Sequence, residues 1–268
     1  MSEQKLAWAT DIHLDFAIPR GTFEGFCQRV NDSGAQKLLI TGDITTGRSI
    51  EEDLKLLAKH IDLPIYFVLG NHDYYYSSFE RVAERVRRLT AQSDRLVWMD
   101  QTGIIELAVD HGLVGFGGWS DGRAGDYNRS YKLNDQVLIE DFNKLNSRQV
   151  LKKLNELGDR SAEYFKDILP QAFDRYDSVV ALTHCPPFVE ACFIEGYKGS
   201  YADLPHFSAP SVGEVMADIM RERPDKMLVV LSGHTHSSAR VAILPNLTCM
   251  VGEAQYGQPS LTLLNIKE

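Results

Sequence analysis

The 268-residue sequence lacks the cysteine spacing of a disulfide-stabilised protein. Its four cysteines, Cys27, Cys185, Cys192 and Cys249, are widely separated, and no two of them form a Cys-x-x-Cys pair. This spacing gives no disulfide framework and favours a reducing compartment, so we expect a cytoplasmic protein. Cys185 directly follows His184, which leaves a thiolate role open, but a small buried residue is the commoner role of cysteine.

Long apolar runs and an excess of basic residues are also missing. No run is long enough to span a bilayer, and residues 1–5 lead directly into a predicted strand without a signal-peptide core. The formal net charge of −9 argues against the basic face that long nucleic acid requires. A small anionic substrate stays possible, because bound metal ions can dominate the local field. We therefore expect neither a membrane nor a long nucleic acid as partner, while the oligomeric state stays open.

The composition is that of an ordinary globular protein, with 44% hydrophobic and 24% charged residues. This length suits a single α/β domain over residues 1–268. Apolar runs and helical periodicity alternate in the first third of the chain, which predicts a parallel sheet with right-handed crossovers. The expected strands are 6–10, 37–40 and 65–69, and the expected helices are 22–31 and 49–60.

The rest of the chain predicts a second sheet and a helical insertion at 119–177. A helix is expected at 74–89, and three short alternating runs then suggest antiparallel strands of the second sheet. The later part predicts two more strands, one helix, a long loop and three final strands. These segments are 96–99, 104–107 and 113–116 for the runs, 178–183 and 227–231 for the strands, 212–221 for the helix and 188–210 for the loop. We therefore predict an α/β fold of two stacked mixed β-sheets flanked by helices.

Side chains that can bind a metal or carry a proton follow five of these strands. In open α/β sheets, ligands bind beyond the carboxyl ends of the strands, so these residues can share one pocket. A single Asp or His at such a place is more often a turn cap, but eight in this order favour a metal site. The candidates are Asp11, His13, Asp43, Asn71, His72, His184, His234 and His236.

The spacing of the candidates predicts two metal ions. Asp11 and His13, like His234 and His236, are two residues apart, and on extended chain such residues point to the same side. Seven ligands are too many for one tetrahedral zinc. They suit two ions about 3.5–4 Å apart, bridged by a carboxylate. Imidazole, carboxylate and amide ligands together fit Mn, Fe, Co or Zn, without a choice among them.

The ordered set of motifs resembles the calcineurin-like metallophosphoesterase superfamily. Its blocks are D-x-H, G-D, G-N-H-D, a single His before Pro, and G-H-x-H, and all five occur in order between residues 11 and 236. The resemblance implies the αββα sandwich of that superfamily and the hydrolysis of a phosphate ester. It also implies that a hydroxide held between two ions attacks phosphorus in line.

The resemblance further implies a role for each candidate residue. The ligands divide into two sets that share one carboxylate, and His72 protonates the leaving group. One set is Asp11, His13, Asp43 and His236, and the other is Asp43, Asn71, His184 and His234.

The sequence departs from the phosphoprotein phosphatase branch at three places. Where that branch has Asp, Arg and Arg, this sequence has Thr46, Gly47 and Leu69, so His72 lacks its usual carboxylate partner. The segment after Trp119 resembles the insertion of bacterial-type members, which fixes no substrate. We expect a small phosphorylated molecule or nucleotide as a monoester or diester. Alternatives are a cyclic-nucleotide phosphodiesterase, a nuclease, or a non-catalytic metal-binding scaffold.

Overall fold

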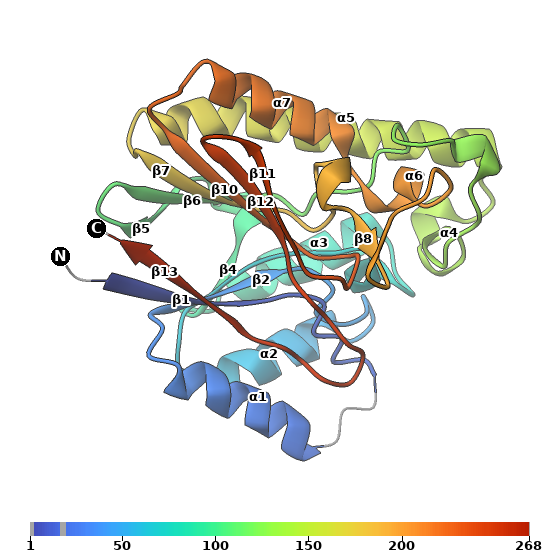
Figure 1. Cartoon of the computed structure of the whole chain (residues 1–268). Coiled ribbons are helices and arrows are strands. Elements are labelled where there is room, and N and C mark those ends of the chain that lie inside the picture. The colour runs from blue at the N-terminus through green and yellow to red at the C-terminus, as the bar shows by residue number, and fades with distance from the viewer. Residues whose placement is uncertain (1–2, 17–19, 268) are drawn as a thin grey trace.

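Two β-sheets lie face to face in the computed structural model, which describes residues 3–16 and 20–267 (Figure 1). The first sheet has five strands in the order β13-β1-β2-β3-β4. Its four N-terminal strands run parallel, and β13 pairs antiparallel with β1. The strands are β1 (Glu3–Ala9), β2 (Lys37–Thr41), β3 (Ile65–Val68), β4 (Leu96–Trp98) and β13 (Thr262–Lys267).

The second sheet has six strands in the order β11-β12-β10-β7-β6-β5. Its four central strands are parallel, and each edge strand is antiparallel to its neighbour. Both sheets are therefore mixed, which confirms the predicted fold class. The strands are β5 (Ile105–Ala108), β6 (His111–Gly115), β7 (Ser178–Leu182), β10 (Met227–Ser232), β11 (Ala239–Leu244) and β12 (Leu247–Val251).

Helices cover the two outer faces of this pair of sheets. Helices α1, α2 and α3 pack on the first sheet, and α5 and α7 pack on the second (Figure 1). Two short helices, α4 and α6, lie beside the edge where the strands end (Figure 1). The helices are α1 (Arg20–Asp32), α2 (Ile50–His60), α3 (Phe79–Thr90), α4 (Asp135–Leu138), α5 (Ser147–Phe173), α6 (Leu204–Phe207) and α7 (Pro210–Arg221).

The alternation of side chains along β1 shows how the layers are joined. Ala7 and Ala9 face the helices of the first sheet, whereas Leu6 and Trp8 pack between the two sheets. Successive residues of a strand point to opposite faces, so a strand buried on both faces needs apolar residues at every position. The apolar runs of the sequence therefore hold the two sheets at a fixed separation and align their carboxyl ends.

The helix predicted at 74–89 begins later than expected. A 3₁₀ turn covers His72–Tyr74, and α3 begins only at Phe79. Ser78 is its N-cap, and the Ser78 side chain accepts a hydrogen bond from the backbone N–H of Arg81. The cap moves the start of the helix away from the strand end, and Tyr75 lies in the turn between them.

Two further expectations were wrong. The strand at 96–99 was expected in the second sheet, but β4 pairs parallel with β3 in the first. The loop expected at 188–210 contains regular structure, with a 3₁₀ turn, the hairpin β8 (Phe193–Ile194) and β9 (Tyr197–Lys198), and α6. Both differences depend on pairing between segments, which local alternation does not encode.

The segment 119–177 contains α4, a 3₁₀ turn at Glu140–Phe142 and the long helix α5. Asn146 caps α5 through a reciprocal capping box with Gln149. The description of this segment as an insertion in a single domain stays a prediction. None of the helices in the described part of the chain is long and apolar enough to cross a membrane.

Candidate metal centre

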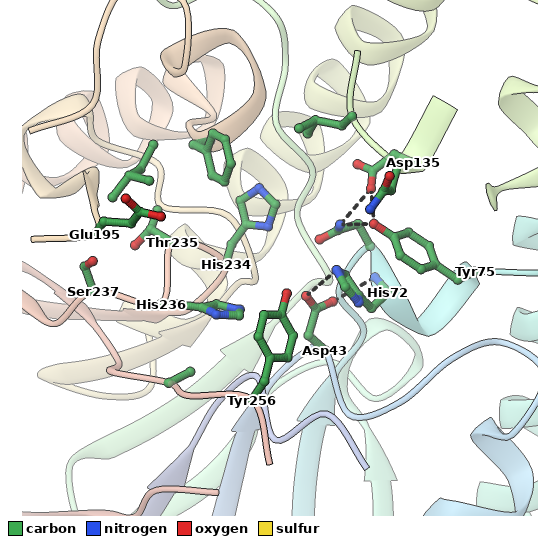
Figure 2. Close-up of a pocket in the computed structure, with 16 residues that line it drawn as sticks. Asp43, His72, Tyr75, Asp135, Glu195, His234, Thr235, His236, Ser237 and Tyr256 are labelled. Carbon is green, nitrogen blue, oxygen red and sulfur yellow. Dashed lines mark hydrogen bonds and ion pairs between the residues drawn. The ribbon is translucent and has the colours of Figure 1, made fainter. Parts of the chain in front are cut away.

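All eight candidate side chains lie at one edge of the two sheets, on the turns that follow five parallel strands. The first sheet contributes the turns after β1, β2 and β3, and the second contributes those after β7 and β10. Side chains on the turns after β2, β3 and β10 line one cavity at this edge (Figure 2). The residues are Asp11 and His13 after β1, Asp43 after β2, Asn71 and His72 after β3, His184 after β7, and His234 and His236 after β10.

The donor atoms form two groups that share Asp43. Within each group the donor atoms lie within 4.8 Å of one another, close enough to hold a metal ion. One group is Asp11, His13, Asp43 and His236, and the other contains Asp43, His184 and His234.

Asn71 completes the second group. Its side-chain oxygen Oδ1 lies 3.0 Å from Nε2 of His184. The same His184 nitrogen lies 3.4 Å from Oδ1 of Asp43. An amide oxygen, a carboxylate oxygen and an imidazole nitrogen therefore converge on one point, as the ligands of a cation do.

Backbone carbonyls orient two of the imidazoles. Nδ1 of His184 lies 2.8 Å from the carbonyl oxygen of Thr41, and Nε2 of His234 lies 2.9 Å from that of His206. A carbonyl only accepts hydrogen bonds, so each of these nitrogens carries the proton. When the ring is neutral, the opposite nitrogen is the one with a lone pair for a metal, and this arrangement is typical of metal-binding histidines.

The first group also brings lone pairs together. Nε2 of His13 lies 3.2 Å from Nε2 of His236, which in turn lies 3.2 Å from Oδ1 of Asp11. Nδ1 of His13 is buried without a hydrogen-bond partner among the described residues. One cation can bind both imidazoles and the buried carboxylate, so the donor set fits a metal ion.

The electrostatics of the metal-free site favour positive charge. Burial raises the pKa of Asp11 and Asp43, but the imidazoles of His236 and His184 outweigh it and hold both carboxyls below their ordinary pKa. Burial lowers the pKa of His184, but Asp43 and Asp11 raise it to about 10. Burial and the nearby His184 lower the pKa of His234 to about 4. The carboxylates thus stay ionised and attract a cation.

Five of the candidate ligands have left-handed backbone, which residues other than glycine rarely adopt. Their φ angles are 48° at Asp11, 43° at His13, 51° at Asp43, 71° at His234 and 56° at His236. The paired residues were expected on extended chain, and this reasoning was wrong, because they lie in tight turns. Such strained conformations cluster at functional sites. The turns still bring both members of each pair into the two donor groups.

Glycines beside the ligands allow the close approach of the turns. A Cβ atom at Gly70 would clash with Oδ1 of Asp43 and lie 2.6 Å from the backbone nitrogen of Asp43. A Cβ atom at Gly233 would clash with the side chains of Thr10 and Asp11. The ligand side chains and neighbouring backbone therefore leave no room for a side chain at either position.

Asp73 fastens the turns after β2 and β3 to each other. It is fully buried, and its Oδ1 accepts hydrogen bonds from the backbone N–H groups of Ile44 and Thr45, both at 2.9 Å. Its Oδ2 accepts a hydrogen bond from the N–H of Gly70 at 2.8 Å. Asp73 therefore braces backbone beside the ligands and fixes the position of Asp43 relative to Asn71.

Replacing Asp73 with Ala is expected to destabilise the metal-free protein by on the order of 3 kcal/mol, because three buried N–H groups lose their acceptor. The measurement is the urea unfolding midpoint, with Asp62→Ala as the control, since the Asp62 side chain is 77% exposed. Equal midpoints for the two variants would show that Asp73 does not brace the turns.

His72 lies beside Asp43 but outside the convergence of donor atoms. Its backbone N–H donates to Oδ1 of Asp43 at 2.8 Å, and its Nε2 is 4.0 Å from Oδ2 of the same residue. Its ring stacks on Tyr75 with centroids 4.2 Å apart. Nδ1 of His72 has no hydrogen-bond partner in the described part of the chain. Burial lowers the pKa of His72, and the negative charge of Asp43 offsets part of this decrease.

The cavity beside the two groups has a volume of about 430 Å³. Several of its residues were not predicted as part of the site, among them Tyr75, Asp135 and Tyr256. Asp135 and Tyr75 lie on one side, opposite His236, and Tyr256 stands between them (Figure 2). The tyrosine run at 74–76 was a usable signal for Tyr75, and the Leu133-Asn134-Asp135 stretch of the segment that resembles the bacterial-type insertion was one for Asp135. Tyr256 lies in no motif.

Comparisons with known proteins agree with this geometry. The model of the calcineurin-like phosphoesterase family matches residues 5–238. A search of the curated proteins found no match.

Several solved structures share the fold. A phosphopantetheinyl hydrolase (PptH) from Mycobacterium tuberculosis is 12% identical with a TM-score of 0.67, and the alignment covers 97% of this chain and 96% of that one. A dimetal phosphatase from Danio rerio is 13% identical with a TM-score of 0.58, covering 93% and 87%. GAP50 from Plasmodium, described as an anchor in the inner membrane complex, is 12% identical with a TM-score of 0.52, covering 94% and 71%.

The identities are too low to transfer a substrate, so these structures show the fold alone. The match to the family model shows more than the fold, because it spans most of the chain and includes every residue of the two donor groups. The chain therefore belongs to the calcineurin-like phosphoesterase family and is a hydrolase of phosphoric ester bonds.

Proposed function

We propose that the protein hydrolyses a phosphate monoester or diester of a small molecule or nucleotide at a site for two metal ions. One ion would be held by Asp11, His13, Asp43 and His236, and the other by Asp43, Asn71, His184 and His234. The observation that carries this proposal is the position of Asp43. Its Oδ2 lies 4.0 Å from Nε2 of His13 and its Oδ1 lies 3.4 Å from Nε2 of His184, so one carboxylate faces both groups.

When bound, the ions would supply a hydroxide at neutral pH and neutralise charge on the phosphoryl oxygens. The side chains of the protein would bind the ions and protonate the leaving group. His72 lines the cavity next to Asp43, so its imidazole is placed to protonate the departing oxygen. Mn, Fe, Co and Zn all suit the donor set.

The cavity size supports a small substrate. A volume of about 430 Å³ lies in the range of pockets for small molecules. We also propose a cytoplasmic protein, since all four cysteines are free and buried. The oligomeric state is open.

A non-catalytic scaffold is the alternative that the comparisons bring to attention, because the Plasmodium neighbour is described as an anchor. Retention of every predicted ligand in two compact groups supports catalysis instead. The test uses metal-stripped protein reconstituted with Mn²⁺, Fe²⁺, Co²⁺ or Zn²⁺, with a nitrophenyl phosphomonoester and a nitrophenyl phosphodiester as substrates. Metal-dependent turnover of either ester is expected, and its absence with every metal would favour the scaffold.

Metal binding is expected to release about one proton near neutral pH. In the metal-free protein the pKa of His184 is raised to about 10, above the ordinary value of about 6.5, so the ring is protonated at pH 7. A metal needs the neutral ring, so its affinity should fall roughly tenfold per unit as the pH decreases below that pKa. Calorimetric titration with Mn²⁺ in buffers of different ionisation enthalpy measures the release. A binding constant independent of pH between 6 and 8 would contradict it.

A further inference from the structure

Asp135 is a carboxylate in the wall of the cavity that the chemistry described so far does not use. It begins α4, within the helical segment 119–177, and its side chain is buried. Its Oδ1 accepts a hydrogen bond from Nδ2 of Asn71 at 2.8 Å and another from the hydroxyl of Tyr75 at 2.7 Å. The residue therefore joins α4 to the turn after β3, and Figure 2 shows it beside Tyr75 at the edge of the cavity.

The bond to Asn71 decides which way its amide faces. An amide presents an oxygen on one side and an NH₂ group on the other, and only the oxygen can bind a cation. Oδ1 of Asp135 accepts its hydrogen bond from Nδ2, which leaves Oδ1 of Asn71 on the opposite side. There, Oδ1 of Asn71 lies 3.0 Å from Nε2 of His184. Without the acceptor, the amide could rotate and turn its NH₂ group toward the ion.

The hydrogen bond to Tyr75 also affects the position of His72, the proposed general acid. The Tyr75 ring stacks on the ring of His72 with an interplanar angle of 27°. Its hydroxyl, fixed by Asp135, prevents the ring from shifting along that contact. One carboxylate thereby orients both a ligand of the second group and the support beneath His72.

We propose that Asp135 is a positioning residue of the second metal site, which rests on the proposed function. It fixes the amide of Asn71 with its oxygen toward the ion and holds Tyr75 under His72. The helical segment 119–177 thus supplies part of the active site from outside the sequence motifs. Loss of a hydrogen-bond partner that orients a metal ligand typically changes metal affinity 10- to 100-fold.

The segment has other attachments that should keep the fold intact when Asp135 is changed. The backbone N–H of Tyr76 donates to the carbonyl of Leu138 at 2.8 Å, and that of Glu140 donates to the carbonyl of Ser77 at 2.9 Å. Asp141 accepts from the backbone N–H of Phe79 at 2.8 Å and contacts neither donor group. Asp141→Ala is therefore a matched control, because it also removes a carboxylate that holds the segment.

The experiment is a calorimetric titration of the metal-stripped full chain with Mn²⁺. Wild type and Asp141→Ala are expected to bind two equivalents with similar affinities. In Asp135→Ala the equivalent assigned to the Asn71 group should bind at least about tenfold more weakly, while the other is unchanged. Asp135→Asn should recover most of the loss, since its amide oxygen accepts the same two hydrogen bonds. If the alanine variant does not fold, Asp135→Leu keeps the branched shape of the side chain without a hydrogen-bond acceptor and should show the same loss.

Wild-type affinity in Asp135→Ala, or an equal loss in Asp141→Ala, would overturn the role of Asp135 and leave the proposed function standing. Failure of the wild type to bind Mn²⁺ would overturn both. A second readout is turnover of an alkyl phosphate ester at saturating Mn²⁺. There we expect kcat of Asp135→Ala to stay below that of Asp141→Ala, because His72 loses its fixed support, and equal kcat values would contradict that part.

Discussion

Asp43→Asn is expected to lower kcat by roughly three orders of magnitude or more, because several kcal/mol of charge stabilisation depend on both ions together. The buried Asp43 carboxylate is the one group common to both donor sets. An asparagine keeps the shape and can still accept the hydrogen bond from the backbone N–H of His72. The substitution therefore removes the negative charge while leaving the turn in place.

The measurement pairs kcat with elemental analysis of bound metal. Fewer than two equivalents are expected, with weakened retention of both. Asp53→Asn is the control, because Asp53 accepts a hydrogen bond from Thr45 near the same turn but belongs to neither group. Two full equivalents in Asp43→Asn would count against a shared carboxylate.

His72→Ala is expected to reduce kcat by about 10²- to 10⁴-fold on an ester with a poor leaving group, without loss of metal. The His72 side chain faces the cavity and lies beside the donor atoms rather than among them. Protonation matters most when the departing oxygen is strongly basic, as in an alkyl ester. A nitrophenyl ester leaves as a weak base, so its hydrolysis should be far less affected.

The ratio of the two rates separates the roles that His72 could have. A general acid changes the alkyl and nitrophenyl rates unequally, whereas a lost ligand lowers both and reduces the metal content. His60→Ala is a suitable control, since His60 packs against Phe23 away from the cavity. Equal losses on both esters together with metal loss would show that His72 is a ligand.

Most of the strands and helices, and the edge where the site lies, could be predicted from the sequence, whereas β8, β9 and α6 were missed. Polar residues follow the buried parallel strands, which are apolar at every position. The carboxyl ends of these strands lie at the same edge of both sheets, so the polar residues lie close together. Asp11 and His236 are 225 positions apart in the sequence. Their contact was predictable because each follows a parallel strand that the local apolar pattern indicates.

The conformation of the ligand turns was not predictable in the same way. Asp and His give no sign that their φ angles will be positive, as those of Asp43 and His234 are. Such strain persists because surrounding contacts impose it. Near Asp43 these are the bonds that Asp73 makes to neighbouring backbone, and at His234 they are the bonds from its backbone N–H to the Asp11 carboxylate. The expectation of extended chain placed the right residues together for a wrong local reason.

Residues outside the motifs were missed because their contacts are long-range and lack periodicity. Asn71 and Asp135 are 64 positions apart, and the bond between them depends on how α4 docks against the turn after β3. The pairing of β4 was misassigned for a related reason, since a three-residue strand carries too little pattern to choose between two sheets. Both errors concern docking between segments rather than the segments themselves.

The central claim is that two ions lie on either side of Asp43. The most direct measurement is an anomalous difference map from a crystal of the full chain grown with Mn²⁺. We expect two peaks about 3.5–4 Å apart, one beside Asp11, His13 and His236 and the other beside Asn71, His184 and His234. A single peak, or two peaks that do not share Asp43, would contradict it.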